Sequence, residues 1–452
     1  MAQASSPPSP LSICENEDNP SSNPSSKRGF SPSPNPTSGL PLPTIPSTVY
    51  SMRVTKLFPL SDAKVSPIST KPNSGIQTPN GSEETEDDDY CLIDKCTPTE
   101  PSNSLATGVN FSGDGHFLAA TSQDNHLTIL DCLDGIVVEA LNFNDFGLGP
   151  VQFAHSNSHI LTASDPGSSA QLPEDALLRY YSLKEESFIQ SFNGHTKPVH
   201  DICVAPHEEL FYTASLDQTI RLWDLRCSSS VADIHTPGKA CISFDPTGRV
   251  LAVADPVKPG IALYDIRYFT ENGFLYFKPD VGANQSWTSI QFTNTGLHIV
   301  LATAGSHHYV FDAFKGTPTH LPLSRSCENS LALTRNELTI TPNGRFIISG
   351  SSEGLLDVWD LHSADGLLLK PGFIEVLNSK SQADSPSKAF PPSHQLTGNR
   401  KEPINVVGFN PHYMTMVSGG SNYAFWEPNL YNLYLPEEKD RPYANARFED
   451  YC

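Results

Sequence analysis

A unit of three short apolar strands recurs seven times from residue 106 onward, and this repeat constrains the fold more than any other feature. In each unit a turn containing Gly, Asn or Asp joins the first two strands. The second strand ends in small residues, a tight polar turn follows, and the third strand ends in an aromatic residue or Leu before Asp. Repeats of this length indicate a propeller or a solenoid. The units span 106–131, 149–183, 199–224, 240–265, 287–312, 336–360 and 404–428.

Short apolar stretches between the units, such as IVVEALNF, FIQSFNG and FLYFKPD, supply a fourth, outer strand for each blade. The last unit lacks such a strand, whereas an isolated strand at 52–58 has no hairpin partner. If the isolated strand completes the last blade, the ring closes and leaves no exposed sheet edge there. The sequence therefore predicts an all-β fold, a seven-bladed β-propeller over residues 51–430.

Low-complexity segments flank and interrupt the repeats. Residues 1–50 are rich in Ser, Pro and Asn, and they bury too little apolar surface to offset chain entropy, so a disordered tail is expected. Disordered insertions are predicted at 61–104, which carries an acidic run at 83–89, and at 379–402. Residues 431–452 are expected to form a C-terminal tail.

Three segments exceed the repeat period: 61–104, about 165–175 and about 379–402. We expect the first and third to join an outer strand to the next inner strand, and the second to join the second and third strands of blade 2. In an up-and-down blade both kinds of connection emerge on one face. All three are therefore predicted to crowd the same face, as tolerated loops or as a screen for partners.

Charge excludes some classes of partner. The chain has 29 Lys+Arg and 50 Asp+Glu, a net charge of -21, and residues 105–452 carry -16 of it. Affinity for nucleic acid depends on cations that neutralise phosphates, so direct sequence-specific DNA binding is not expected. No run of about 18 apolar residues and no secretory leader is present, which predicts a soluble intracellular protein without membrane contact. The nine cysteines form no disulfide framework.

The third unit carries the signature of a WD repeat, since Gly-His at 194–195 precedes Trp-Asp at 223–224 with the expected spacing. In such blades a buried His bonds the Asp of the tight turn, and a Ser and the Trp indole N–H complete the network. Every buried polar group then has a partner. We expect this network to be structural, formed by His195, Ser215, Asp217 and Trp223.

A search for catalytic motifs finds no GxSxG, P-loop, GxGxxG before a helix, HExxH or CxxC. His307 and His308 lie beside a third strand, where alternation points them to opposite sides, so they do not predict a metal site. A hydrolase whose groups come from several blades stays open. We nevertheless predict no catalytic residues, metal or cofactor, and a rigid docking platform whose partner the fold alone does not choose.

Several segments together resemble one family. They include SFNGHTKPVHDICVAP at 191–206, LTITPNGRFIISGSSEG at 338–354, and the more specific DAFKG at 312–316 and NYAFWEP at 422–428. In this order they are similar to the WD-repeat subunit of COMPASS, the histone H3 lysine-4 methyltransferase complex, which in fungi is shared with the cleavage and polyadenylation factor. The resemblance runs from Met52 to Pro428 and leaves out the tail and the insertions.

The resemblance implies a nuclear, non-catalytic scaffold that binds a SET-domain histone methyltransferase and other COMPASS subunits. It also implies a link to transcribing RNA polymerase II, indirectly or through its C-terminal repeats. In the second complex it implies a role with cleavage and polyadenylation factor subunits in mRNA 3'-end processing and transcription termination. Insertions that cover the partner face would make one of these memberships conditional.

Contact residues are predicted from residue type and place, because interface energy concentrates in aromatic and long cationic side chains. The candidates are Lys197, Trp287 and Asn422, although Trp287 packed between blades is an equal alternative. A different function also stays open: a substrate receptor of a cullin-RING ubiquitin ligase. Its adaptor box WDxR would be Trp223, Asp224 and Arg226, unless the Arg simply covers the blade rim with its stem.

Overall fold

The structure, a computed structural model, describes residues 49–59, 66–67, 104–143, 148–164, 178–279, 281, 286–327, 335–362, 389–398 and 402–428. All of them belong to one compact unit, Pro41–Cys452. Residues 1–48 and 431–452 of the predicted tails lie outside this set, as does most of the predicted insertion 61–104.

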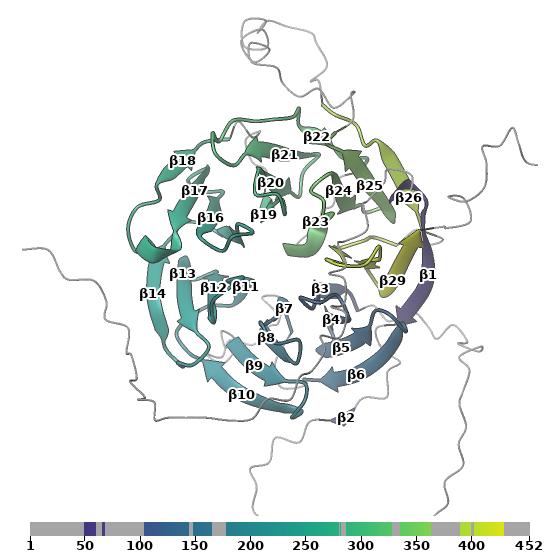
Figure 1. Ribbon diagram of the computed structural model, residues 1–452, viewed down its shortest axis with the longest axis horizontal. Helices are drawn as coiled ribbons and strands as arrows, with labels where there is room; N and C mark the ends of the chain where they lie inside the picture. Colours follow the sequence, from purple (N-terminus) through teal and green to yellow (C-terminus); the bar gives the residue numbers. More distant parts are fainter. Residues whose placement is uncertain are drawn as a thin grey trace, which may run out of the picture. The chain divides into compact units, whose positions relative to one another are not determined.

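Seven antiparallel blades form a closed ring (Figure 1), which confirms the predicted propeller. Blade 1 contains β3 (Ala106–Phe111), β4 (Phe117–Ser122), β5 (His126–Asp131) and β6 (Ile136–Asn142), and blade 2 contains β7 (Val151–Phe153), β8 (His159–Ala163), β9 (Leu178–Ser182) and β10 (Ser187–Phe192). Blade 3 contains β11 (Val199–Val204), β12 (Leu210–Ser215), β13 (Thr219–Asp224) and β14 (Ser230–His235), and blade 4 contains β15 (Cys241–Phe244), β16 (Val250–Asp255), β17 (Gly260–Asp265) and β18 (Leu275–Phe277).

Blades 5 and 6 are built from β19 (Trp287–Phe292), β20 (His298–Thr303), β21 (His307–Asp312), β22 (Leu323–Ser324); and β23 (Leu338–Ile340), β24 (Phe346–Gly350), β25 (Leu355–Asp360), β26 (His394–Thr397). Blade 7 combines β27 (Val406–Phe409), β28 (Met416–Gly419) and β29 (Asn422–Pro428) with β1 (Met52–Pro59). A two-residue strand, β2 (Ser66–Pro67), adds in parallel to β6, and the described 3-10 turns are η2 (Ile266–Tyr268) and η3 (Arg335–Glu337).

The ring closes through β1, the strand predicted at 52–58. It pairs antiparallel with β29 from Met52 opposite Pro428 to Pro59 opposite Asn422, with a bulge between Val54 and Lys56. The Lys56 ammonium also donates to the Asp134 carbonyl of blade 1, 2.7 Å away. A strand from the N-terminal part of the chain therefore completes the last blade and contacts the first.

The hydrophobic core lies between the blades. Each of the seven apolar clusters of the described residues draws on two neighbouring blades, because both faces of a blade are covered by other blades. Trp426, for example, packs with Phe346 and Leu356 of blade 6, and Trp223 packs with Leu161 of blade 2. Blade packing therefore explains why most positions of the inner strands are buried, whether the residue is apolar or polar.

Polar side chains also join the inner strands. Asn110 accepts a hydrogen bond from the Phe153 amide at 2.8 Å, and Asp201 accepts one from the Ile242 amide at 2.9 Å. The Thr339 hydroxyl does the same for the Phe409 amide at 3.1 Å. Because each bond links one blade to the next, the ring is fixed by directional contacts as well as by apolar packing.

The place of β26 corrects the interpretation of the segment 379–402 as one insertion between an outer and an inner strand. β26 lies inside that segment and is itself the outer strand of blade 6. The connection from β25 to β26 therefore joins the third strand to the fourth, and its described ends, 361–362 and 389–393, lie on the side of the ring opposite to the one predicted. This strand was not recognised from the sequence, because only Leu396 of its four residues, HQLT, is buried.

Two faces of the ring can thus be defined. The connection face carries the turns between second and third strands and the connections from outer to inner strands, and the opposite face carries the remaining turns. No described helix is long and apolar enough to cross a membrane.

Candidate docking site on blades 6 and 7

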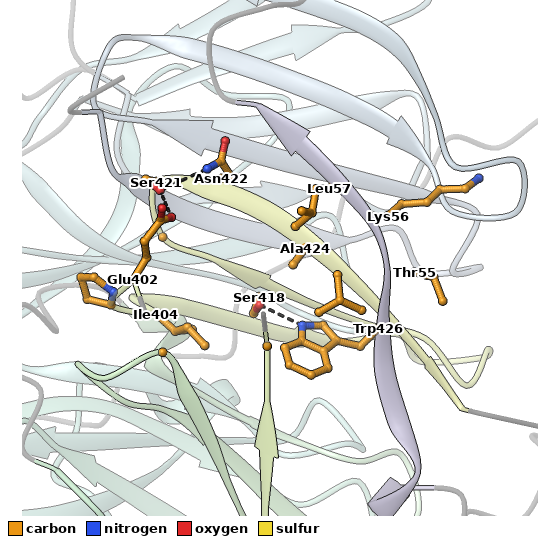
Figure 2. A pocket seen from close by; sticks show the side chains of 15 residues that line it. Thr55, Lys56, Leu57, Glu402, Ile404, Ser418, Ser421, Asn422, Ala424 and Trp426 are labelled. Atoms are coloured by element: carbon orange, nitrogen blue, oxygen red, sulfur yellow. Dashed lines mark hydrogen bonds between the residues drawn. The ribbon is translucent and has the colours of Figure 1, made fainter. Parts of the chain in front are cut away.

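A pocket of about 290 Å³ opens between blades 6 and 7 (Figure 2). It combines an apolar floor with a polar rim. The floor includes Val54 from β1, Ile404 from the connection between the blades, and Ala424 and Trp426 from β29. The rim includes Lys56, Glu402, Ser421 and Asn422.

Close approach of three backbone segments shapes the pocket. The connection at 402–405 passes between the β24–β25 turn and the β28–β29 turn, and the Ile404 amide donates to the Ser351 carbonyl at 3.1 Å. A Cβ on Gly350 would lie 2.6 Å from the Ile404 carbonyl oxygen, and a Cβ on Gly420 would collide with the Pro403 carbonyl. These glycines lack a side chain where the backbones touch.

Trp426 forms part of the pocket floor, and burial and a hydrogen bond fix the position of its ring. The ring is buried, and its indole N–H donates to the Ser418 hydroxyl at 2.9 Å. Gly398, directly after β26, lies next to the ring edge: a Cβ there would meet Trp426 at 3.5 Å, an ordinary contact. The absence of a side chain at Gly398 thus keeps the pocket open.

The rim is polar on one side and apolar on the other. The Ser421 hydroxyl donates to the Glu402 carboxylate, and the Asn422 amide donates to the Ser421 hydroxyl at 3.2 Å. These three side chains face β1 across the pocket (Figure 2). On β1, Leu57 is 47% exposed although it is a large apolar residue. This arrangement of an apolar floor and a partly polar rim suits the binding of a ligand group whose centre is apolar.

The structure places the three predicted contact residues in different environments. Asn422 lines this pocket, and Lys197 is exposed on the connection face in the turn before β11. Trp287 is only 3% exposed and packs with Cys241 and Ile299 between blades 4 and 5. The alternative that Trp287 is a core residue is therefore the correct one, since β19 turns its first side chain toward the neighbouring blade.

The polar network of blade 3 forms around the predicted His, Asp and Trp, with one different hydroxyl. His195 Nδ1 lies 2.8 Å from Asp217, its Nε2 lies 2.7 Å from the Thr213 hydroxyl, and the Trp223 indole donates to that hydroxyl at 2.8 Å. Ser215 instead donates to the Lys197 carbonyl at 2.7 Å. Ser215 also accepts from the Asp217 amide at 3.1 Å and so contacts the network, but the hydroxyl that His195 and the Trp223 indole share belongs to Thr213, two residues earlier on the same strand.

Electrostatics fix the charges in this network. Burial lowers the pKa of His195, and the hydrogen bond to Asp217 only partly opposes this effect. Burial alone would raise the pKa of Asp217, but hydrogen bonds from Thr219, His195 and the Thr196 amide hold it at about 2. A neutral His195 beside an ionised Asp217 leaves each polar atom with a partner, which is a structural arrangement.

The residues of the candidate adaptor box are found at the opposite face. Trp223 is fully buried, whereas the side chain of Arg226 is 73% exposed. Its guanidinium folds back onto Asp224 with two hydrogen bonds of 2.9 and 2.7 Å, and Arg267 repeats this on Asp265 in blade 4. The repeated bond shows that both arginines close a turn of their own blade.

The centre of the ring contains residues of the chain itself. η3 lies against the inner strands β19, β27 and β3. Glu337 of η3 is fully buried and pairs with Arg325, which also donates to the carbonyls of Thr303 and Gly350. Burial raises the pKa of Glu337 against the opposing effect of Arg325. Sequence patterns do not indicate this ion pair, because Arg325 directly follows β22 and Glu337 directly precedes β23, outside the strands of the repeat.

Among the described residues, no group of three or more His, Cys, Asp and Glu side chains is placed to hold a metal ion. His307 and His308 do point to different environments: His308 is fully buried and bonds Ser349 at 3.0 Å, and His307 is half-buried and lies 2.8 Å from the Ser306 hydroxyl. The alternation predicted for this pair is confirmed.

Comparison with known proteins adds a second kind of finding. The family model described as WD domain, G-beta repeat, matches residues 186–224, which include the His-Asp-Trp network. WD repeat-containing protein 82 of Drosophila melanogaster is 30% identical over 71% of this chain and 89% of its own length. The COMPASS component SWD2 of Saccharomyces cerevisiae is 24% identical over 69% and 93%, and the Set1 complex component swd2 of Schizosaccharomyces pombe is 26% identical over 71% and 92%.

Proposed function

Because this chain belongs to the family of WD-repeat proteins that includes WD repeat-containing protein 82 and the COMPASS component SWD2, we propose that it is a non-catalytic scaffold subunit of a histone H3 lysine-4 methyltransferase complex. The observation that carries this proposal is that the similarity covers 92 to 93% of the length of relatives named as COMPASS and Set1 complex components. A scaffold needs a rigid frame and accessible docking surfaces, and both are present.

The connection face of blades 6 and 7 is proposed as the main docking surface. Its pocket is lined by Asn422, and Lys197 lies on the same face of the ring. Interface energy concentrates where a partner side chain enters a pocket that excludes water, and the floor of Trp426 and Ile404 offers that condition. SET-domain methyltransferase and other COMPASS subunits are the proposed partners, in the nucleus.

Finer parts of the proposal concern transcription. The scaffold would link the methyltransferase to transcribing RNA polymerase II, and it would join cleavage and polyadenylation factor subunits in 3'-end processing and termination. These roles need a second partner surface, and the ring offers an opposite face with its own exposed residues, Tyr268 and Phe314.

Affinity purification of the endogenous full chain, with identification of the co-purifying chains, tests the proposal. Recovery of a SET-domain methyltransferase is expected, and a parallel variant without residues 61–104 tests whether the acidic insertion regulates assembly. Recovery of a cullin adaptor instead would favour the ubiquitin-ligase alternative, in which Trp223, Asp224 and Arg226 form the adaptor box. If neither a SET-domain methyltransferase nor a cullin adaptor co-purifies, both functions are contradicted.

A further inference from the structure

We infer that the pocket between blades 6 and 7 binds an extended peptide segment of a partner, which inserts one large apolar side chain and places basic residues on either side of it. The inference concerns the chemistry of the docking surface proposed above and rests on that proposal.

Size selects a side chain over a small-molecule ligand. Pockets for cofactors and drug-sized molecules hold roughly 300 to 1,000 Å³. This cavity, at about 290 Å³, lies just below that range. It offers an apolar floor of Val54, Ile404, Ala424 and Trp426 without a buried charge at its base. A Leu or an aromatic side chain from a chain segment that passes over the rim fits this description.

An extended partner segment has room beside the pocket. β1 borders it and is the outermost strand of blade 7, with β29 as its only strand neighbour in the described part of the chain. Leu57 of β1 stays 47% exposed at this border, and the bulge between Val54 and Lys56 widens the strand here. A segment that crosses β1 would cover Leu57 while it delivers its anchor to the floor.

Charge at the rim selects the flanking residues. Glu402 lines the pocket, and the exposed Glu353 sits next to Gly354, another lining residue. The rim cation, Lys56, points its ammonium away to the Asp134 carbonyl. Residues 105–452 together carry a net charge of -16. Lys or Arg beside the anchor therefore meets complementary charge, whereas Asp or Glu meets repulsion.

Gly398→Leu tests the site with little risk to the fold. The atoms nearest to a Cβ at Gly398 belong to the side chains of Trp426 and Val54, at 3.5 to 3.9 Å. The backbone of Gly398 is not left-handed, so a residue with a side chain is tolerated there. A leucine side chain at this position can therefore fill the pocket. Gly113→Leu is the matched control. Its Cβ meets only Asn157, at 3.9 Å, and it lies in a turn of the opposite face.

The experiment measures fluorescence anisotropy of a labelled peptide with one leucine between pairs of lysines, titrated with the purified full chain. Two comparison peptides replace the leucine by alanine or the lysines by glutamates. We expect the leucine-lysine peptide to bind at least about tenfold more tightly than either, since burial of one Leu side chain suffices for that ratio. Gly398→Leu should weaken it by about tenfold or more, and Gly113→Leu should leave it unchanged.

Glu402→Gln separates charge from shape, because the amide oxygen still accepts from Ser421. It should weaken the two lysine-containing peptides by about threefold each, and it should not weaken the glutamate peptide. Equal binding of all three peptides, equal binding by Gly398→Leu, or no binding at all overturns the inference. If the methyltransferase still co-purifies with the chain in that case, the proposed function survives and only the peptide chemistry is wrong.

Discussion

Thr213 holds together the polar network of blade 3, because its hydroxyl serves His195 and Trp223 at the same time. Thr213→Val should lower the free energy of unfolding by about 2 to 3 kcal/mol, since two buried polar groups lose their only shared partner. Ser215→Ala should cost about 1 kcal/mol, because it removes a bond to a backbone carbonyl. Urea denaturation of both variants measures the difference. A larger loss for Ser215→Ala would contradict the network described.

His200 gives the stability of the ring a pH dependence. Burial and the nearby Lys239 lower the pKa of His200 to about 4, against an unfolded value of about 6.5, and its Nε2 lies 2.8 Å from the Ala240 carbonyl. The unfolded chain therefore binds a proton first. The free energy of unfolding is therefore highest above pH 6.5 and falls as the pH drops toward 4. The expected loss is about 2 kcal/mol between pH 7 and about pH 5.

The variant His200→Gln places an amide donor near the same carbonyl and removes the titration. Its urea midpoint should change less between pH 7 and pH 5 than that of the wild-type chain. An equal change in both proteins would show that other groups carry the pH dependence.

Residue roles could be predicted from sequence where a motif fixes them. The Gly-His and Trp-Asp pairs located the buried network, but the choice between Thr213 and Ser215 depended on which hydroxyl the indole reaches. The pocket itself was out of reach, because Trp426, Ile404 and Val54 come from three separate segments and Gly398 contributes by having no side chain. Only Asn422 was named, from its place at a strand start.

At the scale of elements, β1 decides whether blade 7 is complete. A chain that begins at residue 49 should unfold at the same temperature as the full chain. A chain that begins at residue 60 should lose several kcal/mol, since it exposes the β29 edge and uncovers Trp426. Thermal unfolding and light scattering measure both effects. Unchanged behaviour of the shorter chain would contradict closure by β1.

Strand alternation was predictable for most elements, and β26 shows where it fails. An outer strand touches its blade on one side only, so HQLT with one buried Leu resembles a loop. β6, β10 and β18 carry more apolar residues, and the same reasoning identified them. The difference matters for the proposed docking site, because Gly398, the residue after β26, lines the pocket.

At the scale of the whole molecule, the described part of the chain forms a ring in which each blade depends on its neighbours. Seven inter-blade clusters and the inner-strand hydrogen bonds make a rigid frame, and η3 fills part of its centre. Partners therefore meet surfaces that are already formed. This view explains why the repeat pattern predicted the fold well while the docking site depended on insertions and turns that differ from blade to blade.

We propose that this ring holds a methyltransferase through the connection face of blades 6 and 7. The most direct test is the amount of SET-domain methyltransferase that co-purifies with wild-type chain, Gly398→Leu and Gly113→Leu, expressed at equal levels. We predict full recovery with wild type and Gly113→Leu and about a tenfold loss with Gly398→Leu. Absence of the methyltransferase from the wild-type purification, or equal recovery with all three chains, would contradict the account.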